Sequence, residues 1–361
     1  MTLYTSPEEK QKLARLFEYR KLKPQLLPLL QDAKSLLEAG QKLSVNRSQS
    51  YLQLTEQLNN AVSWGHIAEA TIASVIADGE VAGNQHILLF ELPGTSNRSR
   101  RQFFESLSQP SGAEKTAKRM ADFLEAPSRS SYEILVQSPD ELIVKFVGRR
   151  EYWDTEILSE ETNRVEYAKN RHVERCPVVL KACLSKKLIQ LRVSPRSSGS
   201  NASGKNHYGY ATDVLSSHYA IERDGSWFRS MPPIPIADAF PAIVNSKALL
   251  YEMWSDSPED RAVASRYRNQ GRPKLGFDLR DYQHWNHSGG YARKFLSGFF
   301  RTSAATAAKG VNRQGTLRFI KLHDEKLTND QIHHRASRMF LNAYCADEEI
   351  EYVIDSIRTH I

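Results

Sequence analysis

The sequence contains little cysteine, and its three cysteines form no metal-binding pattern. Cys176, Cys183 and Cys345 include no Cys-x-x-Cys pair, and three thiols cannot all join in disulfides within one chain. We therefore expect reduced thiols and a cytoplasmic protein. The rest of the composition, with 40% hydrophobic and 25% charged residues, is ordinary for a globular chain.

Long hydrophobic runs are also missing. No apolar run approaches the ~20 residues that a membrane-spanning helix needs. The first ten residues include Glu8, Glu9 and Lys10 and have no apolar core of the kind that a signal peptide carries. We therefore expect neither an integral membrane protein nor a secreted one.

Acidic residues are scarce in one part of the chain, residues 261–321, which we call the basic stretch. It contains thirteen lysines and arginines but only two acids, Asp278 and Asp281, so its local charge is +11. The whole chain has a charge of +7, so the remaining residues are net negative. Nine aromatic residues lie among these bases. Because cations bind phosphates and aromatic rings stack on bases, the basic stretch predicts nucleic-acid binding.

The residues predicted to contact nucleic acid carry a positive charge or an aromatic ring. The predicted phosphate contacts are Arg266, Arg268, Arg272, Lys274, Arg293, Lys294, Arg301, Arg313 and Arg318, and the predicted stacking residues are Tyr267, Trp285 and Tyr291. The sequence has no zinc-finger spacing, RNP-type motif or helix-turn-helix pattern. It therefore predicts no sequence specificity and does not choose between DNA and RNA.

The function expected from this pattern is that of a non-enzymatic nucleic-acid-binding subunit of a larger assembly, without a metal or cofactor. The N-terminal helices, or an acidic last helix containing Asp347, Glu348, Glu349 and Glu351, would bind a partner protein. Host defence against phage, replication and repair are all compatible settings, and the sequence does not choose among them.

Two alternatives remain open. Asp278, Asp281, His284 and His287 lie within ten residues and could hold a divalent metal beside a phosphodiester, as in a metal-dependent nuclease. Residues 293–301 combine bases with apolar residues, as interfacial helices do, which would suit a peripheral binder of anionic membranes.

One further motif comes close to a nucleotide-binding loop. Residues 199–206 read Gly-Ser-Asn-Ala-Ser-Gly-Lys-Asn, but Asn206 replaces the hydroxyl that would contact Mg²⁺. Residues 207–210 suggest a poor helix start, so no helix dipole is expected to face a phosphate there. We interpret the segment as a flexible loop rather than an NTPase site.

The predicted fold class is α+β, with an N-terminal helical region, central antiparallel hairpins with helices, and a basic mixed C-terminal region. The predicted divisions are a helical region (1–84), an α+β domain with antiparallel hairpins (85–194), a Ser/Gly-rich loop or linker (195–210) and a basic C-terminal domain (211–361).

Local patterns predict the individual elements. Helices are expected near residues 7–17, 29–40, 51–58, 64–76, 111–125, 238–254, 290–309 and 347–357, with a further helix start at Thr328. A buried strand is expected at 85–92, and hairpins are expected at 132–148 and 176–193. Residues 97–101 are expected to form a small basic loop.

Overall fold

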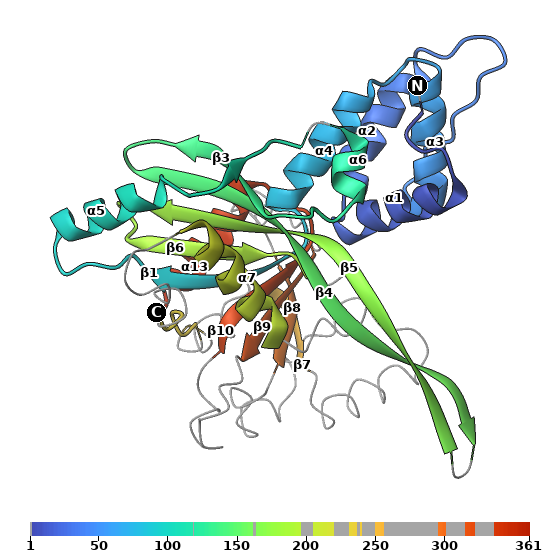
Figure 1. Ribbon diagram of the computed structural model, residues 1–361. Coiled ribbons are helices and arrows are strands. Elements are labelled where there is room, and N and C mark those ends of the chain that lie inside the picture. Colours follow the sequence, from blue (N-terminus) through green and yellow to red (C-terminus); the bar gives the residue numbers. More distant parts are fainter. Residues whose placement is uncertain are drawn as a thin grey trace.

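Helices and a mixed sheet make up the fold (Figure 1), so the predicted α+β class is confirmed. The computed structural model describes residues 2–117, 119–161, 164–195, 205–219, 231–236, 239, 250–255, 295–300, 315–321 and 336–361. Its helices are α1 (Pro7–Tyr19), α2 (Lys23–Lys34), α3 (Tyr51–Ser63), α4 (Glu69–Ala82), α5 (Asn97–Leu107), α6 (Met120–Leu124), α7 (Lys205–His218) and α13 (Asp347–Arg358). Its strands are β1 (Gln85–Glu91), β2 (Ala113–Glu114), β3 (Ser131–Gln137), β4 (Glu141–Glu161), β5 (Arg164–Cys183), β6 (Leu188–Val193), β7 (Leu250–Ser255), β8 (Phe295–Phe300), β9 (Gly315–Lys321) and β10 (Ala336–Asn342).

The described strands form one sheet in the order β2-β3-β4-β5-β6-β1-β10-β9-β8-β7. The short β2 pairs in parallel with β3, and the other neighbours pair antiparallel. Strand β1 lies between β6 and β10, so it joins the hairpins of the central region to the strands near the C-terminus. The predicted domain boundaries stay predictions.

The N-terminal helices pack together at one end of the sheet (Figure 1) around a core that includes Phe17, Leu26 and Leu54. Four helices were expected here and four are present. Ser6 caps α1 as predicted, because its Oγ accepts a hydrogen bond from the Glu9 amide at 3.2 Å. The fourth helix begins at Glu69 rather than near Trp64, which instead follows the last turn of α3.

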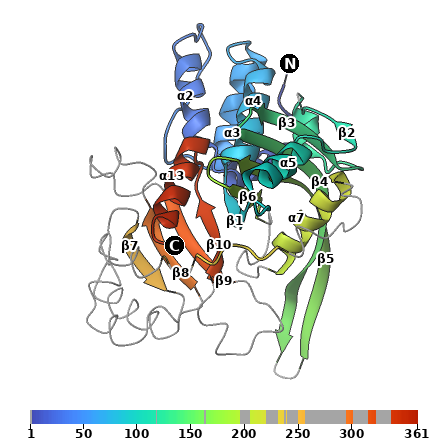
Figure 2. The same ribbon diagram turned by 90° about the vertical axis from the view of Figure 1, so that its left-hand side faces the viewer.

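The sheet has two chemically different faces, because successive side chains of a strand point to opposite sides. One face, the apolar face, buries side chains such as Val144, Phe146 and Leu191 under α5 and α7. The other, the charged face, carries Lys145, Lys181 and Arg192 and is covered in part by α13 (Figure 2). In β1 the same alternation places Leu88 and Phe90 in the core under α5 and α7. Ile87 and Leu89 point to the other side, into an apolar cluster beneath α13.

Both hairpins predicted in the central region are confirmed. Strands β3 and β4 pair from Ser131 opposite Val147 to Gln137 opposite Leu142, and β5 pairs with β6 across the turn that contains Ser185. The length of β4 and β5 was not expected. These two strands pair with each other far beyond the sheet and form a two-stranded ribbon (Figure 1).

Several local expectations were wrong. Residues 97–101 are not a loop but the start of α5, where Ser96 and Ser99 form a reciprocal cap and Phe104 and Leu107 supply the buried stripe. The helix expected over 111–125 is reduced to α6, because Ala113 and Glu114 pair with β3 instead. The 195–210 linker is helical from Lys205 onward.

Two segments near the C-terminus that were expected to be helical contain strands. Residues 250–255 form β7, and residues 295–300 form β8, which hydrogen-bonds to β7 and β9. Gly298 weakens a helix at this position, and pairing on both sides offers the backbone a better alternative. The last helix is confirmed as α13, which buries Ile350, Val353, Ile354 and Ile357. The helix start expected at Thr328 lies outside the described residues.

Candidate functional site

Nearly all sequence-predicted nucleic-acid contacts lie outside the described residues. They are Arg266, Arg268, Arg272, Lys274, Arg293, Lys294, Arg301, Arg313, Tyr267, Trp285 and Tyr291. Arg318 is the exception: it belongs to β9, where its backbone is in register with Phe340 of β10 and Ser297 of β8. The convergence of these residues on one surface therefore stays a prediction.

The described strands do fix where the basic stretch enters the sheet. Ser255 of β7 pairs with Leu296 of β8, and Phe300 of β8 pairs with Gly315 of β9. Phe295 and Phe300, which adjoin the predicted contacts Lys294 and Arg301, are thus at opposite ends of β8. At about 3.3 Å per residue they lie roughly 17 Å apart.

The residues of the metal-dependent alternative, Asp278, Asp281, His284 and His287, also lie outside the described residues. Within the described part, no group of three or more His, Cys, Asp or Glu side chains is placed to hold a metal. The three cysteines are free and buried. Burial raises the pKa of Cys176 to about 11, so its thiol stays protonated and is a poor nucleophile.

Two other segments, the proposed membrane-binding segment and the nucleotide-loop motif, have a local structure that differs from expectation. The membrane-binding helix expected at 293–301 is a strand over residues 295–300. Across the parts of the chain that the structure describes, no helix has the length and apolar character needed to cross a bilayer. Conversely, helix α7 begins at Lys205, within the nucleotide-loop motif, although a poor helix start was expected there. Buried Ala211 and Leu215 of α7 pack on the apolar face and offset its weak helix propensity.

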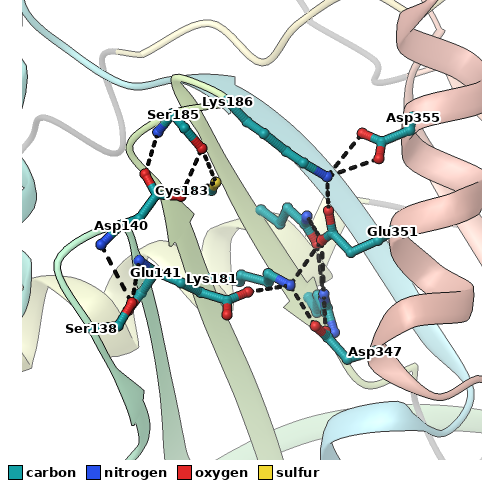
Figure 3. Close-up of polar contacts among 12 residues, drawn as sticks. Ser138, Asp140, Glu141, Lys181, Cys183, Ser185, Lys186, Asp347, Glu351 and Asp355 are labelled. Carbon is teal, nitrogen blue, oxygen red and sulfur yellow. Dashed lines mark hydrogen bonds and ion pairs between the residues drawn. The ribbon is translucent and has the colours of Figure 1, made fainter.

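The structure instead brings together a cluster of charged side chains that the sequence patterns did not predict (Figure 3). Lys181 of β5 bonds to Asp347 of α13, and its Nζ lies 2.7 Å from Glu141 Oε1 and 3.0 Å from Glu351 Oε1. Arg192 of β6 places Nη2 2.6 Å from Asp347 Oδ1. Both bases are almost completely buried beneath α13.

Lys186, in the turn between β5 and β6, extends this cluster along the helix (Figure 3). Its Nζ lies 2.6 Å from Glu351 Oε2 and 2.8 Å from Asp355 Oδ2. Asp347, Glu351 and Asp355 follow one another at intervals of four residues, so they lie on one stripe of α13. Three carboxylates of one helix therefore face three bases of the sheet and its turn.

The charges in this cluster hold one another in their ionised forms. Burial alone would raise the pKa of Asp347, but the Arg192 guanidinium and the Lys181 ammonium outweigh it, so the pKa is lowered. Burial alone would likewise lower the pKa of Lys181, but hydrogen bonds to Asp347 and Glu141 raise it. The pKa of Glu351 is lowered in the same way against burial, chiefly by its hydrogen bond with Lys186.

A second charged cluster lies where the N-terminal helices meet the sheet. Glu80 of α4, only 1% exposed, accepts a hydrogen bond from Arg175 Nε at 2.7 Å and lies 3.6 Å from Lys145 Nζ. Lys145 also lies 2.7 Å from Glu133 Oε2. Burial would raise the pKa of Glu80, but Arg175 and Lys145 outweigh it and the pKa is lowered.

Two buried arginines hold the end of β6. Arg150 donates from Nη1 to the Ser194 carbonyl at 2.8 Å and from Nε to Glu174 at 2.8 Å, and it also bonds to the Pro195 carbonyl. Arg20, which follows α1, donates to the Ser194 hydroxyl at 2.5 Å. These hydrogen bonds connect the helical region, the ribbon and β6 at the point where the chain enters the segment 196–204.

These clusters pair buried bases with carboxylates and carbonyls, which is typical of a structural framework rather than a reacting site. A sequence signal for them existed: Lys145, Lys181 and Arg192 each stand alone among apolar residues of a strand, which predicts facing carboxylates. Counted over the residues that the structure describes, lysines plus arginines and aspartates plus glutamates are equally numerous, 31 of each. The chain's excess of +7 therefore belongs entirely to the residues outside the described part.

No protein-family model, no curated protein and no solved structure matches this chain significantly, so the α+β fold class is established here without a family.

Proposed function

We propose that the chain is a non-enzymatic nucleic-acid-binding protein, a subunit of a larger assembly, that contacts phosphates through the basic stretch. The observation that carries the proposal is the charge imbalance of this stretch, thirteen bases against two acids. Soluble surfaces normally mix the two signs, so an imbalance of this size favours a polyanionic ligand.

The charge pattern of the described residues supports this assignment by contrast. There, buried bases such as Lys145, Lys181 and Arg192 face carboxylates at ion-pair distances. Two of the described bases, Arg318 and Lys321, belong to the basic stretch, so the other described residues have an excess of only two acids against its charge of +11. Phosphates from outside the chain would supply the missing negative charge.

The attachment of the basic stretch to the sheet suggests the form of the ligand. The bases next to β8 adjoin Phe295 and Phe300, which lie roughly 17 Å apart. One nucleic-acid strand rises about 3.4 Å per nucleotide, so this distance corresponds to about five nucleotides. An extended strand of this length would span β8 from one end to the other, which favours an oligonucleotide as the ligand.

A salt titration of binding tests the proposal. The protein is first treated with nuclease and then titrated with single-stranded DNA, double-stranded DNA and RNA oligonucleotides in gel-shift assays. If six or more phosphates are contacted, affinity should fall about 10³-fold or more between about 50 and about 200 mM salt. A flat response to salt for all three ligands would overturn the proposal.

A matched pair of triple variants locates the binding surface. Replacing Arg266, Arg268 and Arg272 with Gln should lower the slope of log affinity against log salt by about 1 for each phosphate that is no longer neutralised. The control replaces Arg15, Lys34 and Arg47, three exposed bases of the helical region, with Gln and changes the net charge equally. Equal effects of the two triples would show that only net charge matters. Cleavage of the oligonucleotide with Mg²⁺ or Mn²⁺, abolished in Asp281→Ala, would instead support the nuclease alternative.

A further inference from the structure

The ribbon formed by β4 and β5 extends far beyond the sheet. Strand β3 pairs with β4 only as far as Val147, and β6 pairs with β5 only as far as Val178. From Arg149 and Arg175 onward the two strands pair with each other, out to Glu161 opposite Arg164. In both views the far ends of β4 and β5 lie apart from the other labelled helices and strands (Figures 1 and 2). We call residues 151–172 the arm.

The arm has the physical character of a surface that binds a partner. An isolated two-stranded ribbon is only marginally stable in water, and both of its edges can accept further hydrogen bonds. At the base of the arm, Trp153 is 63% exposed and the adjacent Val173 is 42% exposed. The register pairs Glu151 with Val173 and Trp153 with Arg171, so both apolar residues lie on the same side of the ribbon.

The other side of the base of the arm is fixed to the body of the protein. Tyr152 stacks on His172 with ring centroids 5.1 Å apart, and Arg150 bonds to Glu174. Tyr210 of α7 lies against Arg150, with its ring 5.8 Å from the guanidinium carbon. Because this side is held against α7, the direction of the arm is set and the side of Trp153 is left for a partner.

The charge of the arm favours a basic protein surface over a nucleic acid. It contains six acids, Glu151, Asp154, Glu156, Glu160, Glu161 and Glu166, and three bases, Arg164, Lys169 and Arg171. Its net charge of −3 repels phosphates. The basic stretch of the same chain has the complementary charge of +11 and nine aromatic residues that can pack against an exposed indole.

We propose that the arm of one copy of this chain binds the basic stretch of a second copy. The two strands of the basic stretch that the structure describes, β8 and β9, are separated from β5 by β6, β1 and β10 in the sheet. A contact between two different surfaces of identical chains joins them head to tail and can add further copies. This inference uses the charge of the basic stretch and does not depend on nucleic-acid binding.

Sedimentation velocity on the full chain tests this inference. Nuclease-treated protein should form species larger than a monomer at low salt, and these should dissociate as salt rises because salt screens the attraction between opposite charges. The arm variant Asp154→Lys, Glu156→Lys, Glu160→Lys should lose the larger species. The control Asp32→Lys, Glu38→Lys, Glu105→Lys places the same charge change on exposed acids elsewhere and should keep them.

A second variant and a second measurement make the result unambiguous. Trp153→Ala leaves the charge unchanged and should also weaken association, while circular dichroism checks that each variant is folded. A chain that stays monomeric at all concentrations and salts would overturn the inference, as would loss of association in both lysine triples or in neither. Gel shifts on the same samples separate the two proposals: the arm variant should still bind nucleic acid, and loss of that binding alone would concern only the proposed function.

Discussion

The two faces of the central sheet reach a buried state by different means. The apolar face buries hydrocarbon side chains such as Phe146, Leu180 and Leu191 beneath α5 and α7. The charged face buries Lys145, Lys181 and Arg192, and each of these bases lies near a carboxylate of α4, α13 or a neighbouring strand. Both faces exclude water, but only the second requires a partner at a defined atom.

This difference separates the free energy of folding from the choice of where each helix docks. Burial of hydrocarbon is favourable in nearly any arrangement that removes it from water. A buried charge is costly unless its partner is present, so Lys181 and Arg192 favour the one placement of α13 that brings Asp347 and Glu351 to them. We infer that buried hydrocarbon, on the apolar face and also beneath α13, supplies most of the stability, and that the buried charges determine where α4 and α13 dock.

The largest effect is expected from removing the most buried acid. Glu80→Gln keeps the size of the side chain but leaves Arg175 and Lys145 without its charge, although Lys145 keeps its ion pair with Glu133. Breaking such a buried pair costs about 3–5 kcal/mol of unfolding free energy. Urea denaturation would measure the loss.

A control and a double variant sharpen this test. Glu56→Gln removes the exposed pair with Lys10 and should cost about 1 kcal/mol or less. Adding Arg175→Gln to Glu80→Gln removes the unpaired base, so the double variant should be less destabilised than the sum of the two single variants. Strict additivity would contradict the coupling of Glu80 with Arg175.

A smaller effect is expected at the α13 cluster, where the acids are partly exposed. The pKa values of Asp347 and Glu351 are lowered in the folded chain, so their contribution to stability is full above the ordinary carboxyl range. It is lost as the pH falls through their lowered folded-state values, because the unfolded chain then binds protons first. Unfolding measured at falling pH should therefore show a steeper loss of stability for the intact chain than for Asp347→Asn.

The dependence of stability on high pH gives an independent check of the same cluster. The pKa values of Lys181 and Lys186 are raised, so their contribution is full below the ordinary lysine value of 10.5 and is lost as the pH rises through the raised values. In Lys186→Met the loss of stability at high pH should be reduced. An unchanged alkaline profile would show that Lys186 contributes nothing through its charge.

Short-range patterns predicted the parts of this fold that short-range forces decide. Ser6 marks a helix start because its hydroxyl bonds to a nearby amide, and the β3–β4 hairpin follows from alternation around a tight turn. Residues 295–300 could not be assigned in this way, because their phenylalanine spacing suits a helix and the strands that pair with β8 are distant in sequence. The charged face was missed for the same reason: Asp347 lies 166 residues from Lys181. The length of the arm left no local signal.

The smallest effect on stability is expected at the base of the arm, where the exposed side of the ribbon carries charges of its own. Glu151 lies between Arg149 and Arg171, with 2.5 Å between its carboxylate oxygens and each guanidinium, and all three side chains are exposed. Solvent screens such pairs, so Glu151→Gln should leave the unfolding midpoint essentially unchanged, in contrast to Glu80→Gln. If the arm binds a second copy, however, the same change should weaken association, because it removes one acid from the binding surface. A variant that unfolds early but associates normally would assign Glu151 to the fold and not to the contact between copies.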